Sequence, residues 1–105
     1  MESNKYNKEG NKEGYWERYY HNGQLDYKGY YKNGRREGYW AFYKPDGKLK
    51  YKGTYNKGQL NGYFEGYWRD GQLYCKGNYR NNEDVGYWEY YDINDKINMK
   101  VYYYK

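Results

Sequence analysis

The sequence predicts an all-β fold: a single-layer antiparallel meander of about eight strands, built from four hairpin repeats of 24 residues. Three observations predict it. Glycine followed by tyrosine and a large aromatic residue recurs at one fixed interval, turn signals divide each interval in two, and no segment shows helical periodicity. The composition agrees, because 26% of the residues are aromatic and few aliphatic residues are present to fill a three-dimensional core.

The repeat is defined by glycines that stand 24 residues apart. Counted from each glycine as offset 0, offset 5 is always Tyr, offset 11 is Leu or Ile, offset 14 is Lys and offset 17 is Tyr. The chain therefore divides into a polar N-terminal partial repeat or cap, residues 1–13, and a repeat sheet, residues 14–105. The predicted units are 14–37, 38–61, 62–85 and 86–105, and they begin at Gly14, Gly38, Gly62 and Gly86.

Each unit carries two turn signals, which predict two strands of roughly seven residues per unit. Asn-Gly and Asp-Gly supply the two positive φ angles of a type I′ turn, so we expect two-residue hairpin loops. A competing three-residue loop with a glycine bulge also fits Lys44-Pro45-Asp46-Gly47. If only one set of turns used that loop, alternate tryptophans would change face. The first set is Asn22-Gly23, Asp46-Gly47, Asp70-Gly71 and Asn94-Asp95, and the second is Asn33-Gly34, Lys57-Gly58 and Asn81-Asn82.

The two-residue register decides which residues share a face. It sets offset 3 opposite offset 14, as Glu17 opposite Lys28, and offset 2 opposite offset 15. The second pairing predicts a ring lying over a glycine: Trp16 over Gly29, Trp40 over Gly53 and Phe64 over Gly77. The predicted apolar face contains Trp16, Trp40, Phe64, Trp68 and Trp88, with the Leu or Ile residues of offset 11. The predicted Tyr/Lys face contains Tyr15, Tyr19, Lys28, Tyr39, Tyr43, Lys52, Tyr63, Tyr67, Lys76, Tyr87 and Tyr91, with the glutamates of offset 3.

Catalysis finds little support in these residues. His21, the only histidine, comes just before a turn, and Cys75, the only cysteine, falls where other units carry apolar-face residues. Each glutamate of offset 3 faces a lysine, which indicates structural cross-strand pairs. No cluster of metal ligands and no phosphate-binding glycine loop is present. We therefore expect a protein that is not an enzyme and that needs neither a cofactor nor a metal.

The surface chemistry points to a binding role. A net charge of +5 favours an acidic partner, phosphate or an anionic membrane. The Tyr/Lys face suits a protein interface, a site for an anionic ligand, or simple shielding of a one-layer sheet. The apolar face would expose a large patch unless a second copy of the chain, a partner protein or curvature of the sheet covered it. The sequence shows no signal segment or membrane span, which predicts a cytoplasmic protein.

Residues 27–48, YKGYYKNGRREGYWAFYKPDGK, resemble a MORN repeat. The repeat is similar to the bacterial variant, with Gly-x-Trp followed by Tyr and Asn-Gly, and the resemblance extends over residues 14–104 with a period one residue longer than usual. It implies a single-layer binding platform. Bacterial members include proteins described as antitoxins, and eukaryotic members are associated with acidic phospholipid. The resemblance thus implies a bacterial or phage module that occludes a partner protein, a toxin or effector. The alternative is binding of an acidic lipid head group, a nucleotide or single-stranded nucleic acid.

Overall fold

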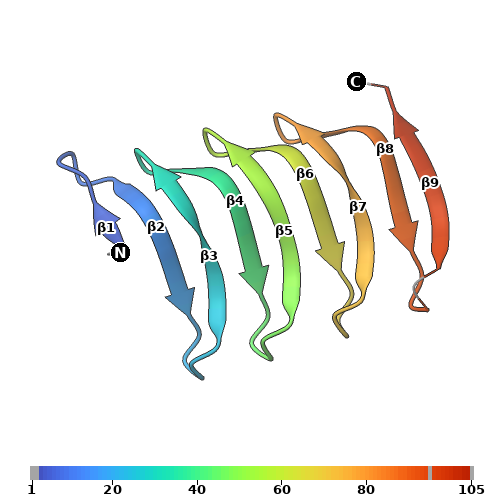
Figure 1. Ribbon diagram of the computed structural model, residues 1–105, viewed down its shortest axis with the longest axis horizontal. Helices are drawn as coiled ribbons and strands as arrows, with labels where there is room; N and C mark the ends of the chain where they lie inside the picture. The colour runs from blue at the N-terminus through green and yellow to red at the C-terminus, as the bar shows by residue number, and fades with distance from the viewer. Residues whose placement is uncertain (1–2, 95, 105) are drawn as a thin grey trace.

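A computed structural model describes residues 3–94 and 96–104 of the chain. They form one open antiparallel sheet whose strand order follows the chain (Figure 1). The all-β meander of hairpin repeats is therefore confirmed, with a short ninth strand contributed by the N-terminal segment. The part of the chain described contains no helix that could cross a membrane. The strands are β1 (Lys5–Tyr6), β2 (Lys12–Tyr19), β3 (Leu25–Lys32), β4 (Arg35–Tyr43), β5 (Leu49–Asn56), β6 (Gln59–Tyr67), β7 (Leu73–Arg80), β8 (Glu83–Tyr91) and β9 (Ile97–Tyr103).

The second set of turns has the predicted two-residue form. Asn33 and Gly34 join β3 to β4 with φ angles of 51° and 80°, the two positive values of a type I′ turn. Lys57-Gly58 and Asn81-Asn82 repeat the same backbone between later strands. Each of these turns also reaches back to the preceding unit, as Gly34 N does to the carbonyl of Lys12 at 2.9 Å.

The first set of turns differs from the two-residue form that we predicted. Gly23 N donates to the carbonyl of Tyr20 at 3.0 Å and Tyr20 N to that of Gln24 at 2.8 Å, which is a three-residue loop whose glycine has a φ of 89°. The turns at Gly47 and Gly71 have the same bonds and backbone. The fourth turn of this set, Asn94-Asp95, includes a residue outside the described ranges. The competing loop is therefore the one formed at these three turns.

The expected change of face does not follow, because a β-bulge adds a compensating residue. The register shifts between Arg18 and Tyr19, so that Tyr19 faces Leu25 while Arg18 faces Tyr27. Beyond the bulge the predicted pairs are all present: Trp16 faces Gly29 and Glu17 faces Lys28. The same pairs recur in the later units, as Trp40 with Gly53, Ala41 with Lys52, Phe64 with Gly77, Glu65 with Lys76 and Glu89 with Lys100.

The bulge does move one group of residues to the other face. Cross-strand partners share a face, and Leu25 is the partner of Tyr19. The residues of offset 11 therefore lie beside tyrosines of the Tyr/Lys face, and the prediction that placed them with the tryptophans is wrong. The other pairs of this kind are Tyr43 with Leu49, Tyr67 with Leu73 and Tyr91 with Ile97.

The large rings cover glycines, but of the preceding hairpin and not of their own. A Cβ added to Gly29 would lie 2.1 Å from the indole of Trp40, and one added to Gly77 would lie 2.1 Å from that of Trp88. Phe64 likewise approaches Gly53. Our prediction that each ring covers its paired glycine is thus wrong in direction. The pairing of β3 with β4 shifts register beside Gly29, and this irregularity leaves room for the Trp40 ring over Gly29.

This placement links successive units and buries the rings within one chain. The indole of Trp40 donates its N–H to the carbonyl of Tyr30 at 2.9 Å, and that of Trp88 to the carbonyl of Asn78 at 3.1 Å. Trp40 is 0% exposed and packs with Phe42 and Tyr55 as the core cluster. The strands are visibly arched in Figure 1. Curvature of the sheet, with rings folded onto glycines, therefore covers much of the apolar face within one chain.

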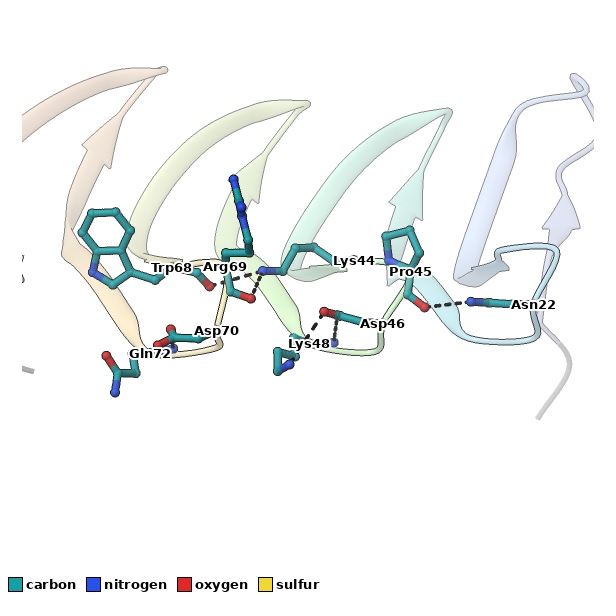
Figure 2. A network of polar contacts seen from close by, with 9 residues as sticks. All are labelled: Asn22, Lys44, Pro45, Asp46, Lys48, Trp68, Arg69, Asp70 and Gln72. Carbon is teal, nitrogen blue, oxygen red and sulfur yellow. Dashed lines mark hydrogen bonds and ion pairs between the residues drawn. The ribbon is translucent and has the colours of Figure 1, made fainter. Parts of the chain in front are cut away.

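The loops of the first set are hydrogen-bonded to one another at one end of the strands (Figure 2). The Lys44 ammonium donates to the carbonyls of Trp68, at 3.3 Å, and Arg69 in the next unit. Asn22 donates to the carbonyl of Pro45 at 2.8 Å. The side chain at offset 6 makes such a bond in each of the first three units, although it is Tyr20, Lys44 or Trp68. The units are therefore joined at their loops as well as through their strands.

Candidate binding surface

The Tyr/Lys face contains a row of residues that alternate in charge from β2 to β9. In the first unit Glu17 faces Lys28. Each later strand adds one residue to this line, and each added residue is paired with the line's residue on the strand before it. Lysine therefore stands opposite glutamate at most crossings. We call this line the charge row: Glu17, Lys28, Ala41, Lys52, Glu65, Lys76, Glu89 and Lys100.

Tyrosine hydroxyls hold the glutamates of the charge row. Tyr63 donates to one oxygen of Glu65 at 2.6 Å and Tyr67 donates to the other, while the Lys52 ammonium lies 3.2 Å away. Glu17 accepts from Tyr15 at 2.7 Å and from Tyr19 at 2.9 Å, and Glu89 accepts from Tyr91 at 3.0 Å. In the first and third units the tyrosines at offsets 1 and 5 thus both donate to one carboxylate, whereas Glu89 accepts from the tyrosine at offset 5.

These contacts shift the acidities of both partners. Burial raises the pKa of Glu65, but the bonds from Tyr63, Tyr67 and Lys52 outweigh burial and lower it. Burial, helped by the bond to Glu65, raises the pKa of Tyr67 to about 12. The hydrogen bonds from two tyrosines also lower the pKa of Glu17. At neutral pH the carboxylates are ionised and the phenols are neutral, so the donor and acceptor roles are fixed.

A second line on this face leaves aromatic rings open to solvent. Tyr39, Tyr63 and Tyr87 are 54%, 46% and 73% exposed, and Tyr15 occupies the same place in the first unit. We call these four residues the tyrosine row. Tyr87 is the most exposed of them, and Tyr19, at offset 5 of the predicted site, is 54% exposed as well. A rigid tyrosine offers contact area at small entropic cost, which suits a recognition surface.

The strand positions opposite the tyrosine row, at offset 16, shape it; Tyr30 and Tyr102 were expected on this face, whereas Thr54 and Asn78 were not named. Tyr30 and Tyr102 pack against Tyr15 and Tyr87 at ring distances of 5.4 and 4.4 Å. The two middle units carry smaller residues, Thr54 and Asn78, at that position. A hollow of about 430 Å³ lies in the third and fourth units, and its lining residues are Tyr63, Lys76, Gly77, Asn78, Tyr87, Trp88, Glu89 and Lys100. Small residues at offset 16 were the available signal in the sequence.

The predicted apolar-face residues lie together, but little of their surface is free. Trp16 and Trp88 are buried, and Phe64 packs on Tyr79 and Trp88 at ring distances of 5.1 and 6.0 Å. Among the described residues, the ring of Trp68 packs on Tyr74, and Tyr74 packs in turn on Tyr90. The guanidinium of Arg36 lies over the rings of Trp40, Phe42 and Tyr55 at 5.0 to 5.4 Å. The predicted faces are therefore both formed, and the Tyr/Lys face is the one that offers accessible rings.

Residues considered for chemistry lie apart from one another. His21 is exposed in the first loop, whereas Cys75 is buried on the apolar face, where burial raises the pKa of its thiol. Among residues 3–94 and 96–104, no group of His, Cys, Asp and Glu could hold a metal ion. Cys75 Sγ approaches the place that a Cβ on Gly66 would take, at 3.2 Å, as expected of a residue that fills space.

The sequence matches the family model of the MORN repeat variant at residues 12–33, 36–57 and 60–81, three segments that together cover more than half of the chain. The chain belongs to the MORN repeat family. Each matched segment begins at the first or second residue of β2, β4 or β6 and ends at the first residue of a type I′ turn, so each MORN segment covers one hairpin of the sheet. MORN repeats are generally binding modules without catalytic activity. No curated protein and no solved structure matches the chain.

Proposed function

We propose that this MORN-repeat chain binds a partner protein through its Tyr/Lys face and covers the partner's functional surface, as an inhibitor of the antitoxin type does. The observation that carries the proposal is the tyrosine row, in which one partly exposed ring per unit stands in register beside the charge row. Aromatic anchors that are already fixed lose little entropy when they bind. The toxin or effector and the bacterial or phage origin belong to this proposal.

The charges on this face favour a protein over a phosphate-rich partner. Lys52 and Lys76 each face a glutamate and lie 3.2 and 3.6 Å from a carboxylate oxygen. Cations that are already neutralised add little to counterion release, which dominates the binding of nucleic acid. The same pairs leave polar groups spread across the interface, where they set the orientation of a partner.

The test is to express the product of the neighbouring gene in a bacterial host with and without this chain. We expect growth arrest or enzymatic activity of that product to be relieved by the chain, and relief to be lost when Tyr39, Tyr63 and Tyr87 are changed together to Ala. Each truncation should weaken binding about fivefold or more, since losing an anchor of this kind costs more than about 1 kcal/mol. Tyr74→Ala, on the other face, is the control. Equal relief by the triple variant would refute the proposal.

The hollow beside Tyr63 and Tyr87 supports a second candidate, recognition of an anionic ligand such as an acidic lipid head group, a nucleotide or single-stranded nucleic acid. Its lining combines two partly exposed rings with Lys76 and Lys100, a pairing of stacking surface and cation that such ligands need. Titration with a nucleotide at low and moderate salt separates the two candidates. A steep loss of affinity with salt, abolished in Lys76→Ala, favours the anionic ligand over the protein.

A further inference from the structure

The charge row is interrupted at a single position among the described strands, where Ala41 on β4 takes the place of a glutamate. Ala41 faces Lys28 on one side and Lys52 on the other. The row therefore contains four lysines and three glutamates, and at Ala41 two lysines flank a position that has no carboxylate. Positions that are equivalent in a repeat have equivalent surroundings, so the other units show what the surroundings of Ala41 are built to hold.

Glu65 provides that template one unit further along the sheet. Its carboxylate accepts from two tyrosines, which lie two residues before it and two residues after it, and it pairs with the lysine on the facing strand. Glu17 has the same two tyrosine donors. In both units a carboxylate with two oxygens is bound by two phenols, and at Glu65 by an ammonium group as well.

The second unit retains the donors and lacks the acceptor. Tyr39 and Tyr43 stand two residues before and after Ala41, as the tyrosines do around Glu65. Neither of their hydroxyls has a hydrogen-bond partner within residues 3–94 and 96–104, whereas each tyrosine around Glu17 and Glu65 has one. Ala41 itself is only 2% exposed, so the position is enclosed by longer neighbouring residues.

We propose that the surface above Ala41 binds a carboxylate from an Asp or Glu side chain of the partner protein. Lys28 supplies the charge, with Lys52 shared between this position and Glu65, and the hydroxyls of Tyr39 and Tyr43 supply the two hydrogen bonds. A carboxylate is favoured over a phosphate because this arrangement binds a singly charged, two-oxygen group in the neighbouring units. This inference rests on the proposed function, since it names the chemistry that the partner presents to the Tyr/Lys face.

The experiment compares variants that fill the position that lacks a glutamate, at residue 41, or create such a position at residue 65. Uniformly ¹⁵N-labelled chain is titrated with a hexaglutamate peptide, and a hexaglutamine peptide is the control. In the unaltered chain we expect hexaglutamate to shift the amides of residues 39–43 and of the facing lysines. Ala41→Glu supplies the missing carboxylate and should weaken peptide binding at least tenfold. Glu65→Ala creates a second interruption and should add shifts around residue 65, while the double variant should bind only there.

Stability provides a second measurement. If the position is prepared for a carboxylate, Ala41→Glu raises the melting temperature, whereas Ala41→Gln does not. The proposal is overturned if Ala41→Glu lowers the melting temperature, if it leaves the peptide shifts unchanged, or if inorganic phosphate produces the same shifts at lower concentration than hexaglutamate. Hexaglutamate binding at Ala41 by a chain that relieves no partner refutes the proposed function alone. Relief of a partner that is unaffected by Ala41→Glu refutes this inference alone.

Discussion

The indole of Trp88 lies on Gly77, in the strand before it, and not on Val101, with which Trp88 is paired. Trp40 is placed in the same way on Gly29. Each ring therefore joins its own hairpin to the one before it, and its N–H is bonded to a carbonyl of that hairpin. In a one-layer sheet without a second layer to pack against, these contacts supply much of the burial between units.

Gly77→Ala should destabilise the chain severely, because its Cβ would lie 2.1 Å from the indole of Trp88. Overpacking of this kind typically costs about 1 to 3 kcal/mol. Gly53→Ala should cost less, since its nearest neighbour is the end of the Leu60 side chain at 2.9 Å. Urea denaturation of both variants, with Asn78→Ala as the exposed control, measures the difference. Equal stabilities of the two glycine variants would contradict the observed ring placement.

The sequence was sufficient to predict which residues face each other, because complementary pairs such as Glu17 with Lys28 recur in successive units. It did not predict the bulge that compensates for the three-residue loops. The extra residue stands at offset 12, where Asp26, Lys50 and Tyr74 have no chemistry in common. A bulge is specified by backbone geometry, and any of these side chains can occupy it.

The sequence did contain a signal for the strand over which each ring lies, and our prediction did not use it. Gly38 and Gly86 have φ angles of 77° and 69° although they lie within strands, so the glycine at offset 0 marks an irregular backbone just before each tryptophan. The site was predictable where it repeats, as the two rows do. The interruption at Ala41 was visible as an exception to the pairing, but its open donors required the hydrogen bonds of the neighbouring units for comparison.

Lys57→Asn should stabilise the chain. Lys57 has a φ of 52° in a type I′ turn, and the equivalent residues Asn33 and Asn81 have φ of 51°. Left-handed backbone costs an ordinary side chain about 1 to 2 kcal/mol, and Asn avoids part of that cost. Thermal unfolding should therefore show a higher melting temperature. Lys50→Asn, at an exposed strand position, is the matched control, and a gain in both variants would mean that charge and not turn geometry is responsible.

Glu65→Gln should reduce the loss of stability in acid. The pKa of Glu65 in the folded chain is lowered from its ordinary value of 4.5. Its contribution to folding is therefore fully present above pH 4.5 and is lost as the pH falls through the lowered value. Chemical denaturation from pH 7 to pH 3 should show the stability gap between wild type and Glu65→Gln narrowing as the pH falls. Glu9→Gln, at an exposed loop position, is the control for removal of one charge, and a constant gap for Glu65→Gln would contradict the prediction.

Lys44→Met should weaken the connection between the second and third units. The ammonium donates to the carbonyls of Trp68 and Arg69, and hydrogen bonds to a charged group contribute about 1.5 to 3 kcal/mol. Methionine retains the apolar stem and removes only the donor. Hydrogen exchange should become faster at the loop around residues 68–71, with a lower midpoint in urea.

Lys48 on the same loop provides the comparison, because its ammonium forms only an exposed pair with Asp46 at 3.7 Å. Exposed ion pairs contribute about 0 to 1 kcal/mol, so Lys48→Met should leave the urea midpoint and the exchange at residues 68–71 nearly unchanged. Similar losses in the two variants would show that the general positive charge of this edge matters, and not the donation by Lys44. A selective loss in Lys44→Met would show that loop side chains, and not strand ladders alone, couple one repeat to the next.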